Sequence, residues 1–207
     1  MSELPPSLWA ETAIEAPSCP RLTEREEADV VVVGAGYTGC SAAIHLASEG
    51  KRVRVLDAAQ PGWGCSGRNG GQVNPGGQRA TPNEVVQTLG EDWGNRFVQM
   101  GHETCDLVFE LIEKYQIDCE AVRPGYVQGG WGNQGLDYQR EWAQQWGKRG
   151  VETELLNQRQ ISDLIGSEYY SHGMYDPRGG NVQPMSFARG LAHAAIEEGA
   201  VIHGESK

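Results

Sequence analysis

The chain has 207 residues, and 17 Lys and Arg against 28 Asp and Glu give a formal net charge of −11 at pH 7. This length fits one domain, or one domain with a small excursion, and 39% hydrophobic residues suffice for a buried core. The acidic balance argues against a nucleic-acid partner, because phosphate binding needs a basic surface. Glycine, with 28 residues, is in clear excess.

The lack of a recognisable targeting signal and the cysteine usage predict a cytoplasmic protein without a membrane partner. The first thirty residues lack the apolar region of a secretory signal, and the apolar run at residues 30–33 is far too short to cross a bilayer. The five cysteines are odd in number, widely spaced and without a CxxC pair. We therefore expect reduced thiols, with neither a disulfide framework nor a metal site.

The first sixty residues predict an N-terminal arm followed by a βαβ unit. Residues 1–28 are expected to be irregular, because prolines at four positions oppose a helix. The β-branched run at 29–33 predicts a parallel strand that is buried on both faces. Apolar residues at helical spacing follow until Gly50, and residues 52–57 predict a second strand.

Further along, residues 58–80 are rich in glycine and predict a loop whose backbone approaches another group closely. Thr81 and Glu84 form a capping box, which predicts the start of a helix. A second helix carries one stripe of seven side chains between Phe97 and Tyr115. The remaining predicted elements are short strands over 117–127, a helix over 136–146 with Trp142 and Trp146 in the core, a strand over 151–156, a helix over 157–165, an extended piece over 169–175, a helix over 184–198 and a strand over 200–203.

Three glycines and one acid form a dinucleotide-binding fingerprint. Gly34 permits a tight turn, Gly36 lets the backbone approach a pyrophosphate, and Gly39 lets the helix pack on the strand. Asp57 ends the second strand, where a carboxylate can bind ribose hydroxyls. The pattern fits FAD and NAD equally, and a glycine-rich turn in an unrelated α/β protein is the remaining alternative.

The segment Gly62-Trp-Gly-Cys-Ser-Gly-Arg-Asn-Gly-Gly-Gln72 favours FAD. With it, the sequence resembles the FAD-dependent oxidoreductases of the D-amino-acid oxidase superfamily, and within them the γ-glutamylputrescine oxidase branch. Further parts of the resemblance lie in residues 9–12, 115–119, 123–125 and 179–184. It implies an α/β fold: a Rossmann-like FAD-binding βαβ domain with the start of a mixed α+β substrate domain.

The resemblance also implies a division of the chain and a set of cofactor-binding residues. The expected segments are an irregular arm (1–28), the βαβ unit with its flavin loop (29–80), a helical segment (81–116), a partial substrate domain (117–184) and a truncated return to the FAD domain (185–207). Besides the fingerprint residues, the expected FAD contacts are Ser66, Arg68, Asn69, Gly70, Gly71 and Gln72. Arg68 would neutralise phosphate or reduced-flavin charge, although an ordinary loop salt bridge is the alternative.

The implied function is oxidation of a C–N bond in a small-molecule amine, with dioxygen as acceptor. Family members continue well beyond the last strand, so the chain is expected to be an N-terminal half with a complementary C-terminal half as partner. A non-catalytic FAD-binding fragment is the second hypothesis, and an NAD-dependent dehydrogenase is the third. Cys65 and Asn181 depart from the family pattern, where Ala and His are usual.

Catalytic residues are not assigned by the sequence. None of the five histidines shows a recognisable pairing with an acid or a nucleophile in the sequence, so each is expected to be structural or exposed. Tyr126 and Trp131 are candidates for an aromatic wall on the substrate side.

Overall fold

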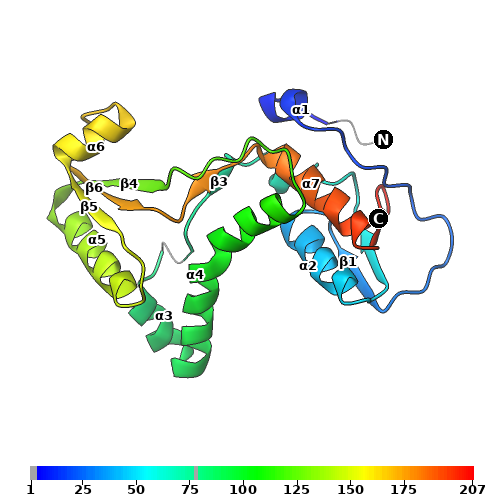
Figure 1. Cartoon of the computed structure of the whole chain (residues 1–207), viewed down its shortest axis with the longest axis horizontal. Coiled ribbons are helices and arrows are strands. Elements are labelled where there is room, and N and C mark those ends of the chain that lie inside the picture. Colours follow the sequence, from blue (N-terminus) through cyan, green and yellow to red (C-terminus); the bar gives the residue numbers. More distant parts are fainter. Residues whose placement is uncertain (1–3, 77–78) are drawn as a thin grey trace. The chain divides into compact units, whose positions relative to one another are not determined.

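The computed structural model describes residues 4–76 and 79–207, which form two compact units (Figure 1). The expected α/β fold is confirmed, with a parallel sheet in unit 1 and an antiparallel sheet in unit 2. Unit 1 consists of Met1–Gln72, Phe109–Ala121 and Asn181–Lys207, and unit 2 consists of Val73–Val108 and Val122–Gly180. The finer division of the sequence into five segments stays a prediction.

Unit 1 begins with the predicted strand, turn, helix and second strand. These are β1 (Val30–Val33), α2 (Tyr37–Ser48) and β2 (Val53–Leu56), and the two strands pair in parallel over all four residues. The burial predicted for both faces of the first strand is wrong, because Val31 and Val33 are 57% and 87% exposed. The predicted last strand is β8 (Val201–His203), which pairs in parallel with the other edge of β2. The strand order is therefore β1-β2-β8, and β2 is central.

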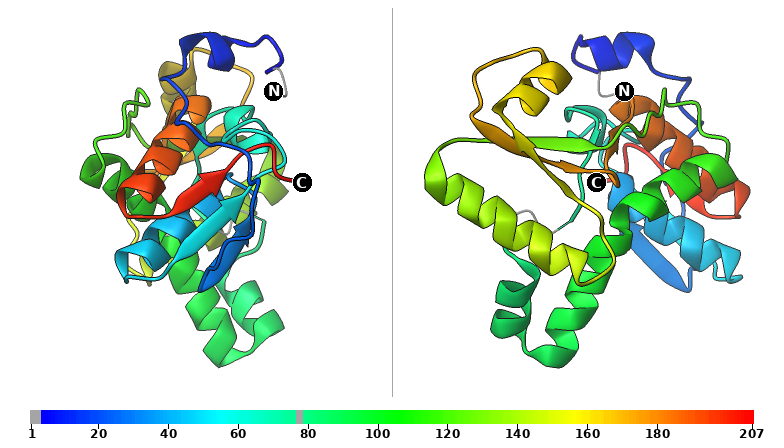
Figure 2. Two further views of the ribbon diagram at one scale, coloured as in Figure 1. Left: turned by 90° about the vertical axis from the view of Figure 1, so that its right-hand side faces the viewer. Right: turned by 60° about the vertical axis from the view of Figure 1, so that its left-hand side comes forward.

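Two helices cover one face of this sheet, as Figure 2 shows. They are α2 and α7 (Pro184–Glu197), which also pack on each other. The apolar stripe of α2 is buried as predicted. In α7, a Cβ atom added to Gly190 would lie 2.1 Å from Cγ2 of Ile117, so glycine permits close packing of this helix.

The prediction of a wholly irregular arm is wrong at one place. A short helix, α1 (Leu8–Thr12), starts after Ser7, whose side chain accepts a hydrogen bond from Ala10 N. The prolines flank this helix instead of interrupting it, so the single turn avoids their steric penalty. Contacts with α7 hold the arm, because Gln183 donates to the carbonyl oxygen of Trp9 at 2.9 Å.

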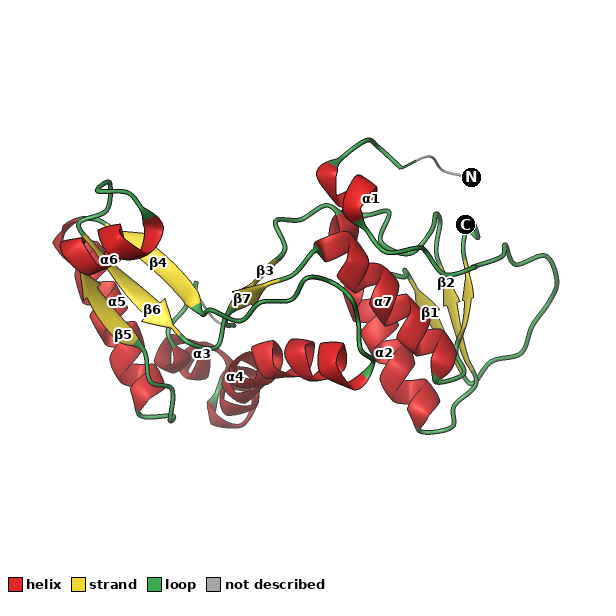
Figure 3. Ribbon diagram, turned by 45° about the horizontal axis from the view of Figure 1, so that its top comes forward, coloured by secondary structure: helices red, strands yellow, loops and turns green. Residues whose placement is uncertain are grey.

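Unit 2 is built on an antiparallel sheet of order β4-β6-β5, with α5 and α6 on opposite faces (Figure 3). Trp142 and Trp146 of α5 pack against Met174, which confirms their place in the core. Gly173 faces Ile161 of α6 instead. The bounds are β4 Tyr126–Gly130, α5 Gly132–Gly147, β5 Glu154–Asn157, α6 Gln158–Ile165 and β6 His172–Asp176.

Two of the remaining elements differ from their predictions. The capping box of Thr81 and Glu84 starts α3 (Pro82–Leu89) as predicted, and α4 (Glu91–Lys114) follows. The stripe predicted for α4 is wrong in its first turns. Val98 is buried there, whereas Phe97 and Met100 are 49% and 54% exposed. Further along the helix, Cys105 is buried.

The strands predicted over 117–127 are likewise reduced to β4, because Gln116, Glu120 and Gly125 take positive φ and interrupt an extended chain. A 3₁₀ turn at Cys65–Gly67, β3 (Gln72–Val73) and β7 (Gly180–Asn181) complete the fold. None of the helices that the structure describes is long and apolar enough to span a bilayer.

Candidate cofactor-binding site

The turn between β1 and α2 requires glycine at three positions, because of backbone conformation or close contacts. Gly34 has φ +99°, and its N–H donates to the carbonyl oxygen of Leu56 at 2.8 Å. A Cβ on Gly39 would lie 1.9 Å from the carbonyl oxygen of Gly34, and a Cβ on Gly36 would lie 2.8 Å from Oγ of Ser66. The three fingerprint glycines therefore keep the turn tight and the space in front of the helix open.

The N-terminus of α2 offers donors to an anion. Gly36 is the N-cap and has no side chain with which to cap the helix. Tyr37 N donates to Oγ of Ser66 at 3.1 Å. The next N–H groups, those of Thr38 and Gly39, have no intrahelical acceptor, as in the first turn of any helix. These donors and the positive end of the helix dipole favour a phosphate at this place.

Asp57 lies at the end of β2, as the fingerprint requires. Its Oδ2 accepts a hydrogen bond from Ala35 N at 2.6 Å, and its Oδ1 accepts one from Ala59 N at 2.7 Å. The carboxylate thus ties the glycine turn to the loop after β2. Each oxygen keeps a further lone pair with which it can accept a ribose hydroxyl.

Asn69 holds together the flavin loop, which is the glycine-rich segment of residues 62–72. Its Nδ2 lies 3.1 Å from Oη of Tyr37 and 2.9 Å from the carbonyl oxygen of Ser66, and its Oδ1 accepts from Gly71 N at 2.8 Å. The side chain is therefore occupied on both ends by protein groups. These bonds position Asn69 within the loop, and its contact with the cofactor stays a prediction.

The two glycines after Asn69 differ from each other. Gly71 has φ +71°, and a Cβ there would lie 2.1 Å from the carbonyl oxygen of Val182. The N–H of Val182 in turn donates to the carbonyl oxygen of Gly71 at 2.8 Å. Gly70 is exposed, and a Cβ there would meet nothing within 4 Å. Gly71 is thus needed for packing against the segment before α7, and Gly70 leaves backbone accessible.

Arg68 keeps its charge available. Its Nε donates to the carbonyl oxygen of Gly64 at 3.3 Å, and its guanidinium lies 4.7 Å from the ring centroid of Trp63. The salt bridge weighed as an alternative is not found, since Arg68 pairs with no acid among residues 4–76 and 79–207. Gln72, at the start of β3, is exposed like Arg68.

Tyr37 is a positioning residue that the sequence analysis missed. Its hydroxyl donates to the carbonyl oxygen of Pro184 at 3.0 Å and accepts from Asn69, and its ring lies 5.0 Å from that of Phe187. Burial raises the pKa of Tyr37, so the hydroxyl keeps its proton. An aromatic residue directly after the second glycine was the available signal. Tyr37 connects the helix N-terminus, the flavin loop and α7.

The histidines are held by structural contacts, and no group of three or more His, Cys, Asp or Glu in the described residues could hold a metal. Trp131 packs against Tyr169 and Tyr170, with which it forms an aromatic cluster in unit 2. The histidine contacts are His45 with Ser41 O, His102 with Arg178, His172 with Gln139 and Gly132 O, His193 with Glu15 O, and His203 with Pro20 O and Glu26.

The chain is similar to two curated proteins and to one solved structure. The chain is 35% identical over 191 residues to "Probable oxidoreductase OrdL" of Haemophilus influenzae, covering 90% of this chain and 43% of that protein. It is 34% identical over 204 residues to gamma-glutamylputrescine oxidoreductase of Escherichia coli, covering 98% and 47%. An L-amino acid deaminase from Proteus myxofaciens, solved with anthranilate, shares the fold with a TM-score of 0.76 at 21% identity, over 94% of this chain and 41% of that one.

The chain therefore spans about half the length of the curated relatives that it matches. The family model described as FAD dependent oxidoreductase matches residues 29–207, a stretch that begins with β1 and includes the whole glycine turn and flavin loop. The cofactor of this family is FAD, and the helix N-terminus, the glycine turn and Asp57 have the donors, space and acceptor that it needs. By this match the chain belongs to the DAO family of FAD-dependent oxidoreductases.

Proposed function

We propose that this chain is the FAD-binding part of an oxidoreductase that oxidises a C–N bond in a small amine or amino acid, with dioxygen as the acceptor. The observation that carries the proposal is the open N-terminus of α2 between the fingerprint glycines and Ser66. The name of the Escherichia coli relative supports γ-glutamylputrescine or a similar amine as substrate. The fold of the amino-acid deaminase supports the broader class of substrates.

Each part of the site has a role in this proposal. The N–H groups at the start of α2 bind the pyrophosphate, and Asp57 accepts hydrogen bonds from the ribose hydroxyls. Arg68 supplies a positive charge on the exposed side of the flavin loop. Tyr37 and Asn69 fix that loop relative to the helix. FAD held by these residues would supply the redox chemistry, namely acceptance of a hydride from the substrate carbon and reoxidation by dioxygen.

The overall reaction balances without a further co-reactant. One amine, one dioxygen and one water give a carbonyl compound, the released amine or ammonia, and hydrogen peroxide. The imine that forms first is hydrolysed, so the water oxygen ends in the carbonyl group.

A complementary half is the second part of the proposal. The relatives are about twice as long as the matched region. A flavin that only half of its protein covers is open to water, and a substrate cannot be oriented against it. We therefore expect this chain alone to bind FAD weakly and to oxidise no amine. The FAD-binding fragment without catalysis then describes the isolated chain, and the oxidase describes the completed one.

The experiment compares the chain alone with the chain plus the C-terminal part of the Escherichia coli relative that lies beyond the match. FAD binding is followed by the quenching of flavin fluorescence, with NAD as the competing dinucleotide. Peroxide release is measured with γ-glutamylputrescine, putrescine, sarcosine and D-alanine. We expect FAD binding that NAD does not displace, and peroxide only from the mixture. Rapid turnover by the chain alone would refute the need for a complement, and failure of both samples to bind FAD would refute the assigned site.

A further inference from the structure

The flavin loop rests on the start of α7 at its glycines. A Cβ on Gly62 would lie 3.0 Å from Sδ of Met185, and a Cβ on Gly67 would lie 2.7 Å from the same atom. Met185 is itself only 1% exposed. The N–H of Val182 donates to the carbonyl oxygen of Gly71 at 2.8 Å. Loop and helix start are therefore in direct contact, and the position of the helix start sets that of the loop.

The same helix start also holds the N-terminal arm. Gln183 is the N-cap of α7 and is 3% exposed. Its Oε1 accepts from Ser186 N at 2.6 Å, and its Nε2 donates to the carbonyl oxygen of Trp9 at 2.9 Å and to Oγ1 of Thr12 at 3.0 Å. Oγ of Ser186 accepts in turn from Ile14 N at 3.2 Å. Because a backbone N–H can only donate, this network fixes which end of the amide caps the helix and which end binds the arm.

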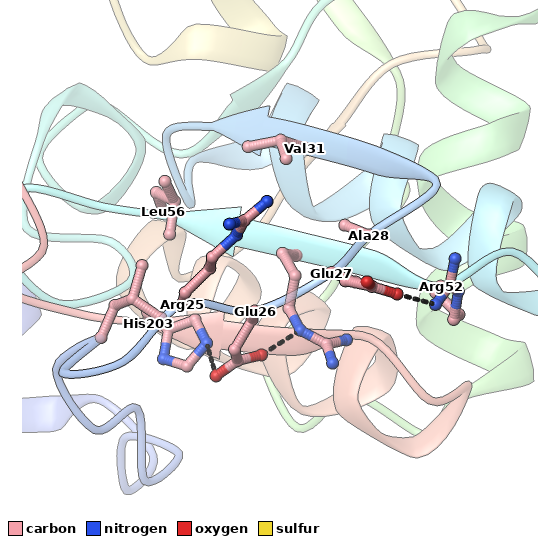
Figure 4. A pocket seen from close by; sticks show the side chains of 10 residues that line it. Arg25, Glu26, Glu27, Ala28, Val31, Arg52, Leu56 and His203 are labelled. Carbon is pink, nitrogen blue, oxygen red and sulfur yellow. Dashed lines mark hydrogen bonds and ion pairs between the residues drawn. The ribbon is translucent and has the colours of Figure 1, made fainter.

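The far end of the arm is fixed to the sheet of unit 1. Glu26 pairs with His203 of β8 at 3.1 Å, as Figure 4 shows, and with Arg54 of β2. The carbonyl oxygen of Pro20 lies 3.2 Å from Nδ1 of the same histidine. When the bonds to α7 open, residues 8–14 therefore remain tethered close to the helix. Opening and renewed docking of this part of the arm are then local events within one chain.

We propose that residues 8–14 of the arm position the flavin loop for the cofactor, and that Gln183 is the positioning residue that joins the two. Docking of the arm fixes the start of α7, and the start of α7 fixes the loop. Because FAD is proposed to bind against this loop, the role of the arm rests on the proposed function. The backbone N–H of Gln183 also donates to the carbonyl oxygen of Cys119 at 2.7 Å, so the helix start has a second support. Loss of the arm contacts should therefore weaken FAD binding and not abolish it.

A coupling of this kind acts in both directions. If the docked arm strengthens FAD binding by some factor, bound FAD strengthens docking of the arm by the same factor. None of the proposed FAD contacts lies in residues 8–14, so a response of the arm to FAD has to pass through the loop and α7. An arm that only stabilised the fold would lack this response. Exchange of the Ile14 amide hydrogen, which is bonded to Ser186, reports the docking directly.

Two variants release the arm without changing the loop. Gln183→Glu keeps an oxygen that can cap α7 and loses the donor to the arm. Thr12→Val loses the hydroxyl that accepts from Gln183. Its matched control is Thr88→Val in α3, because both hydroxyls donate to the carbonyl oxygen four residues earlier, at 2.9 Å for Thr12 and 2.8 Å for Thr88. Of the two threonines, Thr12 has the further bond to α7.

Amide hydrogen exchange and FAD titration are measured on the 207-residue chain without amine. In the cofactor-free chain, both arm variants should speed exchange at Val182, whose N–H donates to the flavin loop. Both should bind FAD about threefold to tenfold more weakly, whereas Thr88→Val should bind like the unchanged chain. Saturating FAD should slow exchange at Ile14 in the unchanged chain and leave exchange over α6, in unit 2, as it is.

Four results would overturn the proposal: equal FAD affinity in the arm variants and the unchanged chain, an equal loss in Thr88→Val, unchanged exchange at Val182, or exchange at Ile14 that FAD does not slow. Circular dichroism checks that each variant remains folded, and should one arm variant unfold, the other still gives the test. If the unchanged chain and every variant alike fail to bind FAD, the assigned cofactor site is refuted together with the role of the arm. The oxidase chemistry is not involved, because no amine is present.

Discussion

The backbone N–H of Ala35 donates to Oδ2 of Asp57 at 2.6 Å, across the gap between the glycine turn and the end of β2. The acid that the fingerprint assigns to ribose binding therefore also holds the turn in shape. The two roles are compatible, because a carboxylate has about four acceptor sites and the two backbone N–H groups occupy two of them.

Replacing Asp57 should affect both roles. Asp57→Ala is expected to weaken FAD binding by on the order of 1–3 kcal/mol, through the lost charged hydrogen bond to ribose and the loosened turn. Asp57→Asn keeps one acceptor oxygen, so its FAD affinity should lie between those of the unchanged chain and Asp57→Ala. Fluorescence titration with FAD measures the affinities, and urea unfolding separates the effect on the fold. An unchanged dissociation constant for Asp57→Ala would show that this acid does not contact the cofactor.

Gly36→Val should abolish FAD binding. A Cβ at this position already lies 2.8 Å from Oγ of Ser66, and the branched side chain would also fill the space in front of the helix N-terminus. The control is Gly147→Ala, at a position where a Cβ meets nothing within 4 Å and φ is ordinary. Equilibrium titration with FAD decides the outcome. Wild-type affinity in Gly36→Val would place the pyrophosphate elsewhere.

Tyr37→Phe tests whether the loop is held from α2. The change removes one hydroxyl, which bonds the carbonyl oxygen of Pro184 and Asn69. The expected loss is about 1–2 kcal/mol of unfolding free energy, with a similar loss of FAD affinity because the loop is no longer fixed. Tyr169→Phe, at a ring that is 67% exposed, serves as the control and should be neutral in both measurements.

The five thiols should react in a fixed order. Cys65 is exposed, whereas the other four are buried. Burial raises the pKa of Cys19 and Cys119 to about 11 and that of Cys40 to about 12. At pH 8 a thiol of pKa 11 is about one part in a thousand thiolate, which is the reactive form. Ellman's reagent on the native chain should modify Cys65 first, and all five only after denaturation. Rapid native modification of Cys40, seen by mass spectrometry, would contradict this order.

The local parts of the fold follow from sequence because their causes are local. The capping box at Thr81 and Glu84 and the apolar stripe of α2 each depend on residues within a few turns. Which faces of α4 are buried depends on packing that its periodicity does not contain. Phe97 fits the stripe and is exposed, whereas Val98 beside it is buried. Positive φ at Glu120 likewise has no signal in a non-glycine residue.

The candidate site divides in the same way. Gly34, Gly36 and Gly39 could be identified from their spacing, because one short turn imposes all three. The roles of Asn69 and Tyr37 could not, since their partners are up to 147 positions away along the chain. Gly71 stays a predicted cofactor contact, and its second role, close packing against Val182, depends on a residue far along the chain. Such contacts exist only once the fold is complete.

The hydrogen bonds between the N-terminal arm and residues 186–206 have a consequence for biosynthesis. Ile14 N bonds Oγ of Ser186, 172 positions later, and Leu22 N bonds Oγ of Ser206, 184 positions later. The arm therefore cannot meet these partners until residues 186–206 have been synthesised. Until then β2 has no β8 beside it, and the valines of a nascent sheet are open to chaperones and proteases. Unit 1 thus forms after translation of residues 184–206, and not as the arm and β1 emerge.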